Sequence, residues 1–401
     1  MKILTVDIGT GTQDIFLFDS NLDMENGFKL VIPSPTMMIH RQIKEATRLR
    51  TPILLTGKLM GGGPSAWAAR EHAAAGIPTY ATPEAAKTLD DEPAKVEKMG
   101  IKIVSEDESR SSGWSSGEAG SSPVLRLDLK DFDFPLISET FSRFGVSLTD
   151  LAAVCVAVFD HGDAPRGVSD RQFRFDYLDE RIKAKNALSS FAFLSGDVPP
   201  IMTRLQAVAD SAKDLDAPLI VMDTAPAAIL GASFDPLVSA RRRKIIVNVG
   251  NFHCLAFRLG EGGCPGAFAG VEGVFEHHTG EIDRPKLEGY IRALADGSLT
   301  HQTIFDDMGH GALVYGDHPL ELDNADWQIA VTGPRRSLFQ GAIHPSSFRL
   351  HPYFAVPFGD MMLSGNFGML AAAADLLPEL KEPIRKSLQG QTGIAPWELQ
   401  S

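Results

Sequence analysis

The sequence predicts an α/β protein of two domains, each built on a mixed sheet, that close on a cleft. A strand–turn–strand pattern begins the chain at residues 2–19 and recurs at residues 244–257, and a repeated domain start is a stronger signal than one hairpin alone. Helices rich in alanine are expected at residues 224–232 and 365–373, one in each half. The chain of 401 residues is long enough for two such cores.

The first hairpin contains the first candidate site. A β-rich apolar run leads to Asp7, and a glycine–threonine turn follows before apolar residues resume. Glycine lets the backbone turn sharply and approach a ligand closely. The turn's N–H groups and threonine hydroxyls suit an anion such as phosphate, and Asp7 is placed to hold a hydrated Mg²⁺ beside it. An ordinary hairpin with a solvated aspartate is the alternative. The turn consists of Gly9, Thr10, Gly11 and Thr12.

Strands and helices are expected to alternate after this hairpin. A third strand is expected at residues 28–32, a helix at 37–49 and a buried strand at 53–57. A glycine-rich loop, 58–64, then leads into a helix at 65–75. The loop lacks the Walker pattern, so it is either a substrate-facing loop or a plain connection.

In the middle of the chain, two predicted strands are each followed directly by an aspartate. Residues 105–122 are rich in Ser, Gly and Glu and predict a long loop or a partly disordered insertion. An apolar strand at 151–159 runs into Asp160, and another at 218–222 runs into Asp223. Asp223 precedes the first alanine-rich helix, for which an N-cap would be a sufficient role.

The second half contains a further turn motif. After the hairpin at 244–257, residues 327–331 predict a strand that runs into a Thr332-Gly333 turn and then Arg335. The arginine could stack on a base or pair with a phosphate, although a solvated side chain is the simpler alternative.

In this order the motifs resemble those of the superfamily of acetate and sugar kinases, heat-shock ATPases and actin. The first turn is similar to its first phosphate loop, which reads Asp, any residue, Gly-Thr, then small residues. The second hairpin, the Thr332-Gly333 turn and the two alanine-rich helices take the places of the second phosphate loop, the adenosine loop and the linking helices. Within the superfamily the chain is most like a prokaryotic family whose members are often labelled pyruvate formate-lyase activating.

This resemblance implies two actin-like (ribonuclease H-like) domains around a nucleotide cleft. The first would be residues 1–235 with an insertion around 58–215, and the second residues 236–401, with the division near 234–243. The activity implied is that of an ATP-binding, Mg²⁺-dependent phosphotransferase or ATPase.

The resemblance also implies residue roles. Asp160 is the candidate general base for a substrate hydroxyl, with a loop-terminating aspartate as the alternative, and Asp223 would orient water or metal. The assigned residues are Asp7 and, through water, Asn248 for Mg²⁺; Gly9, Thr10, Gly11, Thr12, Gly250 and Asn251 for phosphates; Thr332, Gly333 and Arg335 for adenosine; and Asp7, Asp223 and Asp160 for catalysis.

The second hairpin departs from the superfamily pattern. Asn248 replaces an aspartate and carries no charge, and Phe252 stands where small residues approach the phosphates. Charge neutralisation is the dominant need in phosphoryl transfer. A non-catalytic nucleotide or metabolite sensor or scaffold is therefore the rival hypothesis.

Composition excludes several classes. A net charge of −13 without a long basic run argues against nucleic-acid and anionic-membrane partners, so a small-molecule substrate or a protein partner is expected. No signal peptide is visible, and three cysteines give no disulfide framework, which fits the cytoplasm. They also lack the Cys-x3-Cys-x2-Cys spacing of a radical iron–sulfur enzyme. No Gly-x-Ser-x-Gly elbow or Rossmann fingerprint suggests a hydrolase or dehydrogenase.

Histidines form a second candidate site. His161, His277 and His278, with Asp160 and Glu276, supply ligands that suit zinc or iron. Adjacent histidines on a strand point to opposite faces, so at most one of His277 and His278 is expected to join a given site. Substrate contact and simple exposure are the alternatives.

Overall fold

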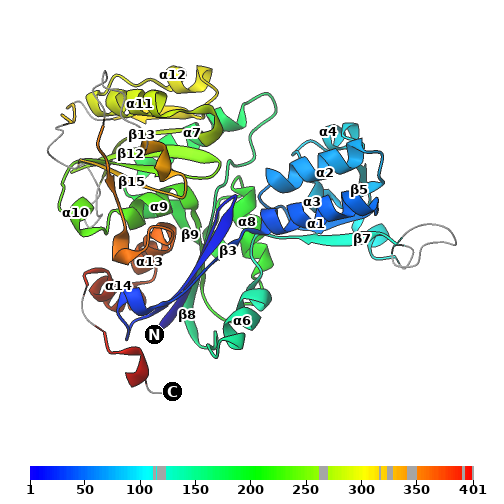
Figure 1. The fold of residues 1–401 in the computed structure, drawn as a ribbon, viewed down its shortest axis with the longest axis horizontal. Coiled ribbons are helices and arrows are strands. Elements are labelled where there is room, and N and C mark those ends of the chain that lie inside the picture. Colours follow the sequence, from blue (N-terminus) through cyan, green and yellow to red (C-terminus); the bar gives the residue numbers. More distant parts are fainter. Residues whose placement is uncertain are drawn as a thin grey trace.

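The structure is a computed structural model that describes residues 1–111, 114, 123–261, 270–315, 318–322, 328–340, 350–390 and 393–399. Cys264, Trp327 and most of the serine-rich segment 105–122 lie outside these residues. The described chain forms two mixed six-stranded sheets and one four-stranded parallel sheet, all flanked by helices (Figure 1). An α/β fold with mixed sheets is therefore confirmed. Within the described ranges, no helix has the length and apolar character needed to cross a membrane.

The first sheet is organised around the N-terminal hairpin. The strand order is β3 (Phe28–Pro33), β2 (Thr12–Asp19), β1 (Lys2–Ile8), β8 (Leu151–Val158), β10 (Leu219–Asp223) and β9 (Ala192–Leu194). Strand β1 pairs antiparallel with β2 and parallel with β8, which pairs parallel with β10.

The second sheet repeats five strands of this arrangement. Its strand order is β14 (Gly311–Val314), β13 (Gly270–His278), β12 (His253–Gly260), β11 (Lys244–Val249), β15 (Ile329–Thr332) and β16 (Tyr353–Phe354). The hairpin of β11 and β12 is antiparallel, and β11 pairs parallel with β15, as β15 does with β16. Both sheets contain an antiparallel meander of three strands that are consecutive in the sequence. Beside the first strand of this meander lie two further strands, both parallel to it.

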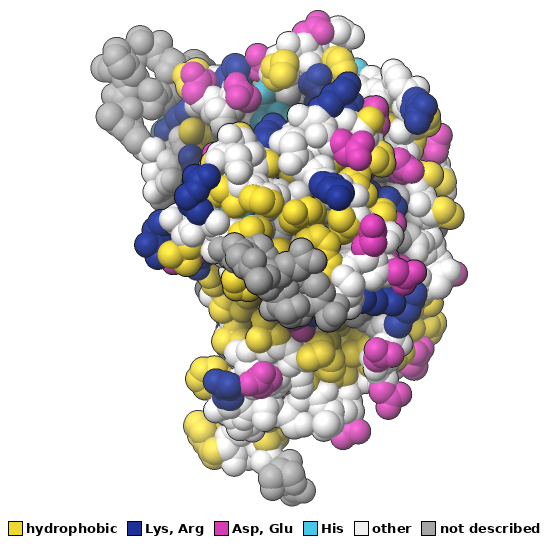
Figure 2. Space-filling view, turned by 90° about the vertical axis from the view of Figure 1, so that its right-hand side faces the viewer, with side chains coloured by type: hydrophobic (Ala, Val, Ile, Leu, Met, Phe, Trp, Pro, Cys, Tyr) yellow, Lys and Arg dark blue, Asp and Glu magenta, His cyan; other side chains and the backbone are white. Residues whose placement is uncertain are grey.

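The third sheet is built from the chain between β3 and β8. Its order is β6 (Lys102–Ile103), β5 (Thr79–Ala81), β4 (Ile53–Gly57) and β7 (Leu125–Leu129). With its helices it forms a lobe that projects from the body (Figure 1). The helices of this stretch are α1 (Pro35–Leu49), α2 (Pro64–Ala74), α3 (Pro83–Ala86), α4 (Pro93–Lys98) and α5 (Glu106–Ser109). Seen from the lobe end, acidic and basic side chains are interspersed, and histidine side chains lie recessed in a hollow near the top (Figure 2).

Two helices lie in the core that the two large sheets share. These are α9 (Thr224–Ala232) and α13 (Ser364–Leu376), both buried along nearly their whole length. Side chains of β11 alternate between two cores, as the period of a strand requires. Ile246 belongs to the core that contains α9 and α13, whereas Val247 packs into a second core with α11 (Arg284–Asp296).

Glycines allow α9 and α13 to approach each other closely. A Cβ atom on Gly368 would overlap the backbone oxygen of Ala227, and one on Gly231 would overlap that of Ser364. The small residues in these helices thus permit backbone-to-backbone packing, as the sequence predicts.

The remaining helices cover the outer faces and the C-terminal end. The shared core includes residues from Ile3 to Leu388, so the last helices complete the first sheet's packing. The chain then returns to the N-terminal hairpin, where Ile394 forms a bridge with Leu22. These helices are α6 (Phe134–Arg143), α7 (Asp170–Ala184), α8 (Thr203–Ser211), α10 (Pro236–Ser239), α12 (His301–Asp306) and α14 (Lys381–Leu388).

Candidate functional site

The two hairpin turns face each other across one pocket. In each turn the first glycine donates its N–H to the residue three positions on, Gly9 to Thr12 and Gly250 to His253, both at 2.9 Å. The turns also touch, because a Cβ atom on Gly11 would overlap the side-chain amide of Asn251. The predicted phosphate-binding residues of both halves therefore come together. Among the residues that line the pocket are Asp7, Gly9, Thr10, Thr12, Asp14, Thr224, Asn248, Gly250, Asn251, Phe252, Thr332 and Gly333.

Two carboxylates lie side by side at the base of this pocket. Asp7 and Asp14 are direct partners in the β1–β2 register and so share one face of the hairpin. Asp7 accepts a hydrogen bond from the Thr224 hydroxyl at 2.6 Å, while one buried oxygen of Asp14, Oδ1, has no hydrogen-bond partner. Burial raises the pKa of Asp7 to about 6, and the Asp223 charge adds to the effect. Burial followed by repulsion from Asp7 raises the pKa of Asp14 to about 8.

Sequence reasoning missed Asp14, although a signal for it existed. A tight turn over residues 9–12 pairs position 7 with position 14, so the register alone placed a second acid beside Asp7. Two adjacent buried acids, both with a raised pKa, indicate that no cation among the described residues compensates their charge.

The second half contributes an amide and a turn to the same pocket. Asn248 and Thr332 are partners in the parallel β11–β15 register. Gly333 follows with a φ of 96°, and a Cβ atom there would overlap the side-chain oxygen of Asn248. Only glycine fits this position. Arg335 instead lies exposed outside the pocket lining, with its backbone N–H bonded to the Val249 oxygen at 2.9 Å.

The other two predicted catalytic aspartates are engaged elsewhere. Asp223 caps α9 by accepting the Ala225 N–H at 2.9 Å, and it also pairs with Arg174. Asp160 lies in the lining of a neighbouring cavity, and its two oxygens accept the N–H groups of Gly162 and Leu205 at 2.8 and 2.9 Å. Burial raises the pKa of Asp160.

Arg174 is a buried hub that the sequence does not reveal. It lies on α7 with 1% of its side chain exposed and donates to Asp223 at 2.6 Å and to Glu276 at 3.0 Å. Its guanidinium also donates to the Asp160 backbone oxygen at 2.7 Å and lies 3.9 Å from the centre of the Phe159 ring. One cation thus joins the ends of β8 and β10 to β13 of the second sheet.

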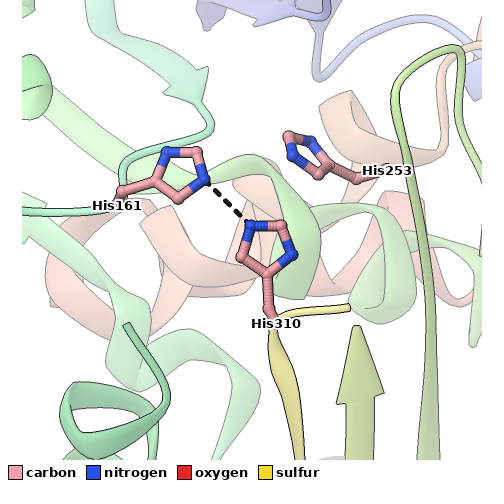
Figure 3. Close-up of side chains that lie close together, drawn as sticks. All are labelled: His161, His253 and His310. Atoms are coloured by element: carbon pink, nitrogen blue, oxygen red, sulfur yellow. Dashed lines mark hydrogen bonds between the residues drawn. The ribbon is translucent and has the colours of Figure 1, made fainter. Parts of the chain in front are cut away.

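The predicted histidines separate into two groups. His277 points away, with Nε2 at 3.0 Å from the Asp307 carboxylate. His161 instead lies beside His310, with 3.1 Å between their Nε2 atoms, and His253 completes the group (Figure 3). The ring of His278 is 4.7 Å from that of His310, centre to centre. As expected from strand geometry, the adjacent histidines do not share one site.

Comparisons with known proteins give one family assignment. No curated protein matches the chain. Among solved structures, the ROK hexokinase from Thermus thermophilus is similar at 13% identity over 98% of this chain and 91% of the other, with a TM-score of 0.24. A TM-score of this size does not establish a common fold. A family model described as "Putative pyruvate format-lyase activating enzyme (DUF1786)" matches residues 60–338, well over half of the sequence. The chain therefore belongs to the DUF1786 family.

Proposed function

We propose that the pocket between the two hairpin turns binds a Mg²⁺-nucleotide, and that the protein is an ATP-dependent phosphotransferase or ATPase with an actin-like fold. One observation carries the proposal: two sheets that share an arrangement of five strands bring equivalent turns face to face over a single pocket. The actin-like (ribonuclease H-like) reading takes residues 1–235 and 236–401 as the two domains.

The turns offer the groups that phosphates require. Backbone N–H groups of consecutive turn residues form an anion-binding concavity, and the hydroxyls of Thr10 and Thr12 add donors. Gly250 and Asn251 supply the opposite wall. Thr332 and Gly333 lie at the remaining edge, where a flat base could rest against a backbone without side chains.

The donor set fits Mg²⁺. Mg²⁺ prefers oxygen ligands and keeps several waters, and Asp7 with Asp14 supplies carboxylates, one oxygen of which is buried without a partner. Asn248 would bond a metal-bound water. When bound, the ion neutralises charge on the phosphates. Asp7 would remain positioned by Thr224, whose hydroxyl it accepts at 2.6 Å.

The acceptor would enter from the neighbouring cavity. Gly9, Thr10, Phe159, Arg204, Phe252 and His253 line both hollows, so the two are continuous at the turn. Asp160 lies in the wall of the second hollow and is the proposed general base, since burial raises its pKa toward the range useful for proton transfer.

We do not propose the activity that the family description names, which is that of a pyruvate formate-lyase activating enzyme. A radical activating enzyme needs three cysteine ligands for its iron–sulfur cluster. Of the cysteines in the described ranges, Cys155 lies in the first sheet and Cys254 in the second, both fully buried, and burial raises the pKa of each thiol to about 12. Neither buried thiol is suited to ligate an iron–sulfur cluster as a thiolate.

A sensor remains the second candidate because of Phe252. Its ring packs 5.9 Å from that of Trp67 on α2, centre to centre, and so spans from the second turn to the third-sheet lobe. A nucleotide that displaces this contact would move the lobe without any chemistry.

Calorimetry with Mg²⁺-ATP tests the proposal. We expect saturable binding to the wild type, weaker binding to Asp7→Asn, and unchanged binding to Asp214→Asn, an exposed aspartate in the turn before β10. Absence of binding to the folded wild type removes the nucleotide claim.

Turnover separates the two candidates once binding is established. ATP hydrolysis or phosphoryl transfer by the wild type, well above background, excludes the sensor. A sensor that lost its chemistry should instead gain turnover in Asn248→Asp/Phe252→Gly, which restores the charge and space that the second turn lacks.

A further inference from the structure

Three histidines from distant parts of the chain converge behind the second turn. His161 follows β8, His253 begins β12, and His310 precedes β14. One potential ligand nitrogen from each lies within 4.8 Å of the other two. Figure 3 shows the three rings directed toward one another around a common space.

We propose that His161, His253 and His310 form a binding site for a divalent late first-row transition metal, with Zn²⁺ as the best match. Three neutral imidazoles with one open position are the donor set of a zinc site that also takes up water or a substrate. Asp7 and Asp14 are not among these ligands, and the proposal does not depend on the proposed nucleotide, although His253 also lines the pocket between the turns.

Without an ion, the ring nitrogen atoms of these histidines have few hydrogen-bond partners. Nε2 of His161 and Nε2 of His310 are 3.1 Å apart, so one of them must donate its N–H to the other. Nε2 of His253 is buried and has no hydrogen-bond partner. A buried polar atom without a partner costs about 1–3 kcal/mol. A metal would engage lone pairs of all three rings at once.

The geometry needs a small contraction. With metal–nitrogen bonds of about 2.0–2.1 Å, tetrahedral ligands are roughly 3.3 Å apart. The His161–His310 pair already has this spacing, at 3.1 Å. The third nitrogen would have to approach by roughly 1.5 Å to reach the tetrahedral spacing, which a rotation of the partly exposed His161 or His253 side chain can supply.

Neighbouring groups orient the rings. His253 stacks on Phe159 with 3.9 Å between ring centres and 10° between planes. Nδ1 of His310 lies 3.3 Å from a Glu276 oxygen. The two atoms do not form a hydrogen bond, but a small rotation of the His310 ring would allow one. A carboxylate behind a ligating histidine fixes its tautomer and raises its basicity.

The protonation states also suit a metal. Burial lowers the pKa of His161 to about 3, with Arg174 and Arg204 adding to it, and burial lowers the pKa of His253 and His310 as well. The lone pairs that would bind an ion are therefore not occupied by additional protons at neutral pH. His161 and His253 also line the second hollow, so the open position faces the cavity that contains Asp160.

Metal titration of the full-length protein tests this site. Protein stripped with a chelator should bind one equivalent of Zn²⁺ in competition with a chromophoric chelator, and Co²⁺ should give the strong visible bands of a four- or five-coordinate ion. His161→Gln, His253→Gln and His310→Gln should each weaken binding at least ~100-fold, beyond the 10–100-fold typical of groups behind the ligands. His301→Gln is the matched control, because His301 also has a buried Nε2 without a partner but lies outside the cluster.

The proposal fails if the wild type takes up no Zn²⁺ at micromolar concentration, or if the three variants bind as well as His301→Gln. If a variant does not fold, X-ray absorption of the wild-type Zn²⁺ complex decides the matter. About three imidazole nitrogens at ~2.0 Å support the site, whereas sulfur or oxygen ligands alone contradict it.

Discussion

The guanidinium of Arg174 lies 3.0 Å from the carboxylate of Glu276, and this ion pair joins α7 to β13 of the second sheet. Both side chains are almost completely buried, at 1% and 2% exposed. Asp223 completes the triad from the first sheet at 2.6 Å. The two halves are therefore linked by a charge network as well as by the packing of α9 and α13.

Replacing Arg174 by methionine should destabilise the protein strongly. It leaves two carboxylates buried without a cation, a defect that costs about 3–5 kcal/mol. Arg174→Lys should recover only part of this, since an ammonium cannot reproduce the forked contacts. Denaturant unfolding measures both. Arg143→Met, at an exposed pair on α6, is the control and should change stability by less than about 1 kcal/mol.

Asp7→Asn should strongly reduce Mg²⁺-dependent turnover while leaving the fold intact. Asparagine keeps an oxygen for the Thr224 hydroxyl, so the change removes charge more than shape. We expect a loss of about 100-fold or more in kcat, the scale seen when an electrostatic group is removed from a reacting centre. A coupled assay of ATP turnover gives the rate, and unimpaired turnover would clear Asp7 of the role. Asp214→Asn should behave as wild type.

The buried pair Asp7 and Asp14 should contribute less to the stability of the metal-free protein as pH rises. The folded pKa values of Asp7, about 6, and Asp14, about 8, exceed the ordinary aspartate value of 3.8, so the folded state binds these protons more tightly than the unfolded state. Their contribution to the free energy of unfolding therefore decreases from about pH 4 to about pH 8. Because the buried histidines, whose pKa is lowered, contribute in the opposite direction below about pH 6.5, the effect is measured as the difference in melting temperature between the wild type and Asp14→Asn across this range.

Two controls belong to the pH experiment. Millimolar Mg²⁺ should restore stability at the upper end of the range, and Asp14→Asn should lack the part of the pH dependence that Asp14 supplies. A profile of Asp14→Asn that matches the wild type would show that Asp14 does not titrate as described.

Gly368→Ala should destabilise the protein by about 1–3 kcal/mol or more, the usual cost of overpacking. The added methyl meets the backbone of Ala227, which cannot rotate away. Gly289→Ala on α11 is the matched control, since a Cβ atom there meets nothing within 4 Å. At this exposed position of the helix, alanine should stabilise by about 0.5–1 kcal/mol. Equal effects of the two substitutions would contradict the close crossing of α9 and α13.

Local patterns made part of this fold predictable. The hairpins at 2–19 and 244–257 combine alternating apolar residues with glycine turns, and both form within a few residues of the expected limits. Asp223 caps α9, the role that its position before a small-residue helix suggests. The Asp7–Asp14 pair was also predictable, because counting residues outward from the turn of the first hairpin pairs these two positions.

Long-range contacts made the rest unpredictable. The third sheet joins short parallel strands whose pairing has no local signature, and α7, which contains Arg174, was not expected at all. Arg174 and Glu276 are 102 residues apart, and His161 and His310 are 149 apart. A single sequence holds no information on which distant residues share such a site.

The return of the C-terminal helices to the first sheet has a consequence for biosynthesis. The core around β1 needs Phe367, Leu370 and Ile384, which are translated long after β1. During translation, the apolar side chains of the N-terminal hairpin therefore remain incompletely buried until α13 and α14 have been synthesised. A nascent chain stalled before residue 364 should remain sensitive to protease in its first sheet, and it should become resistant only after α13 has emerged.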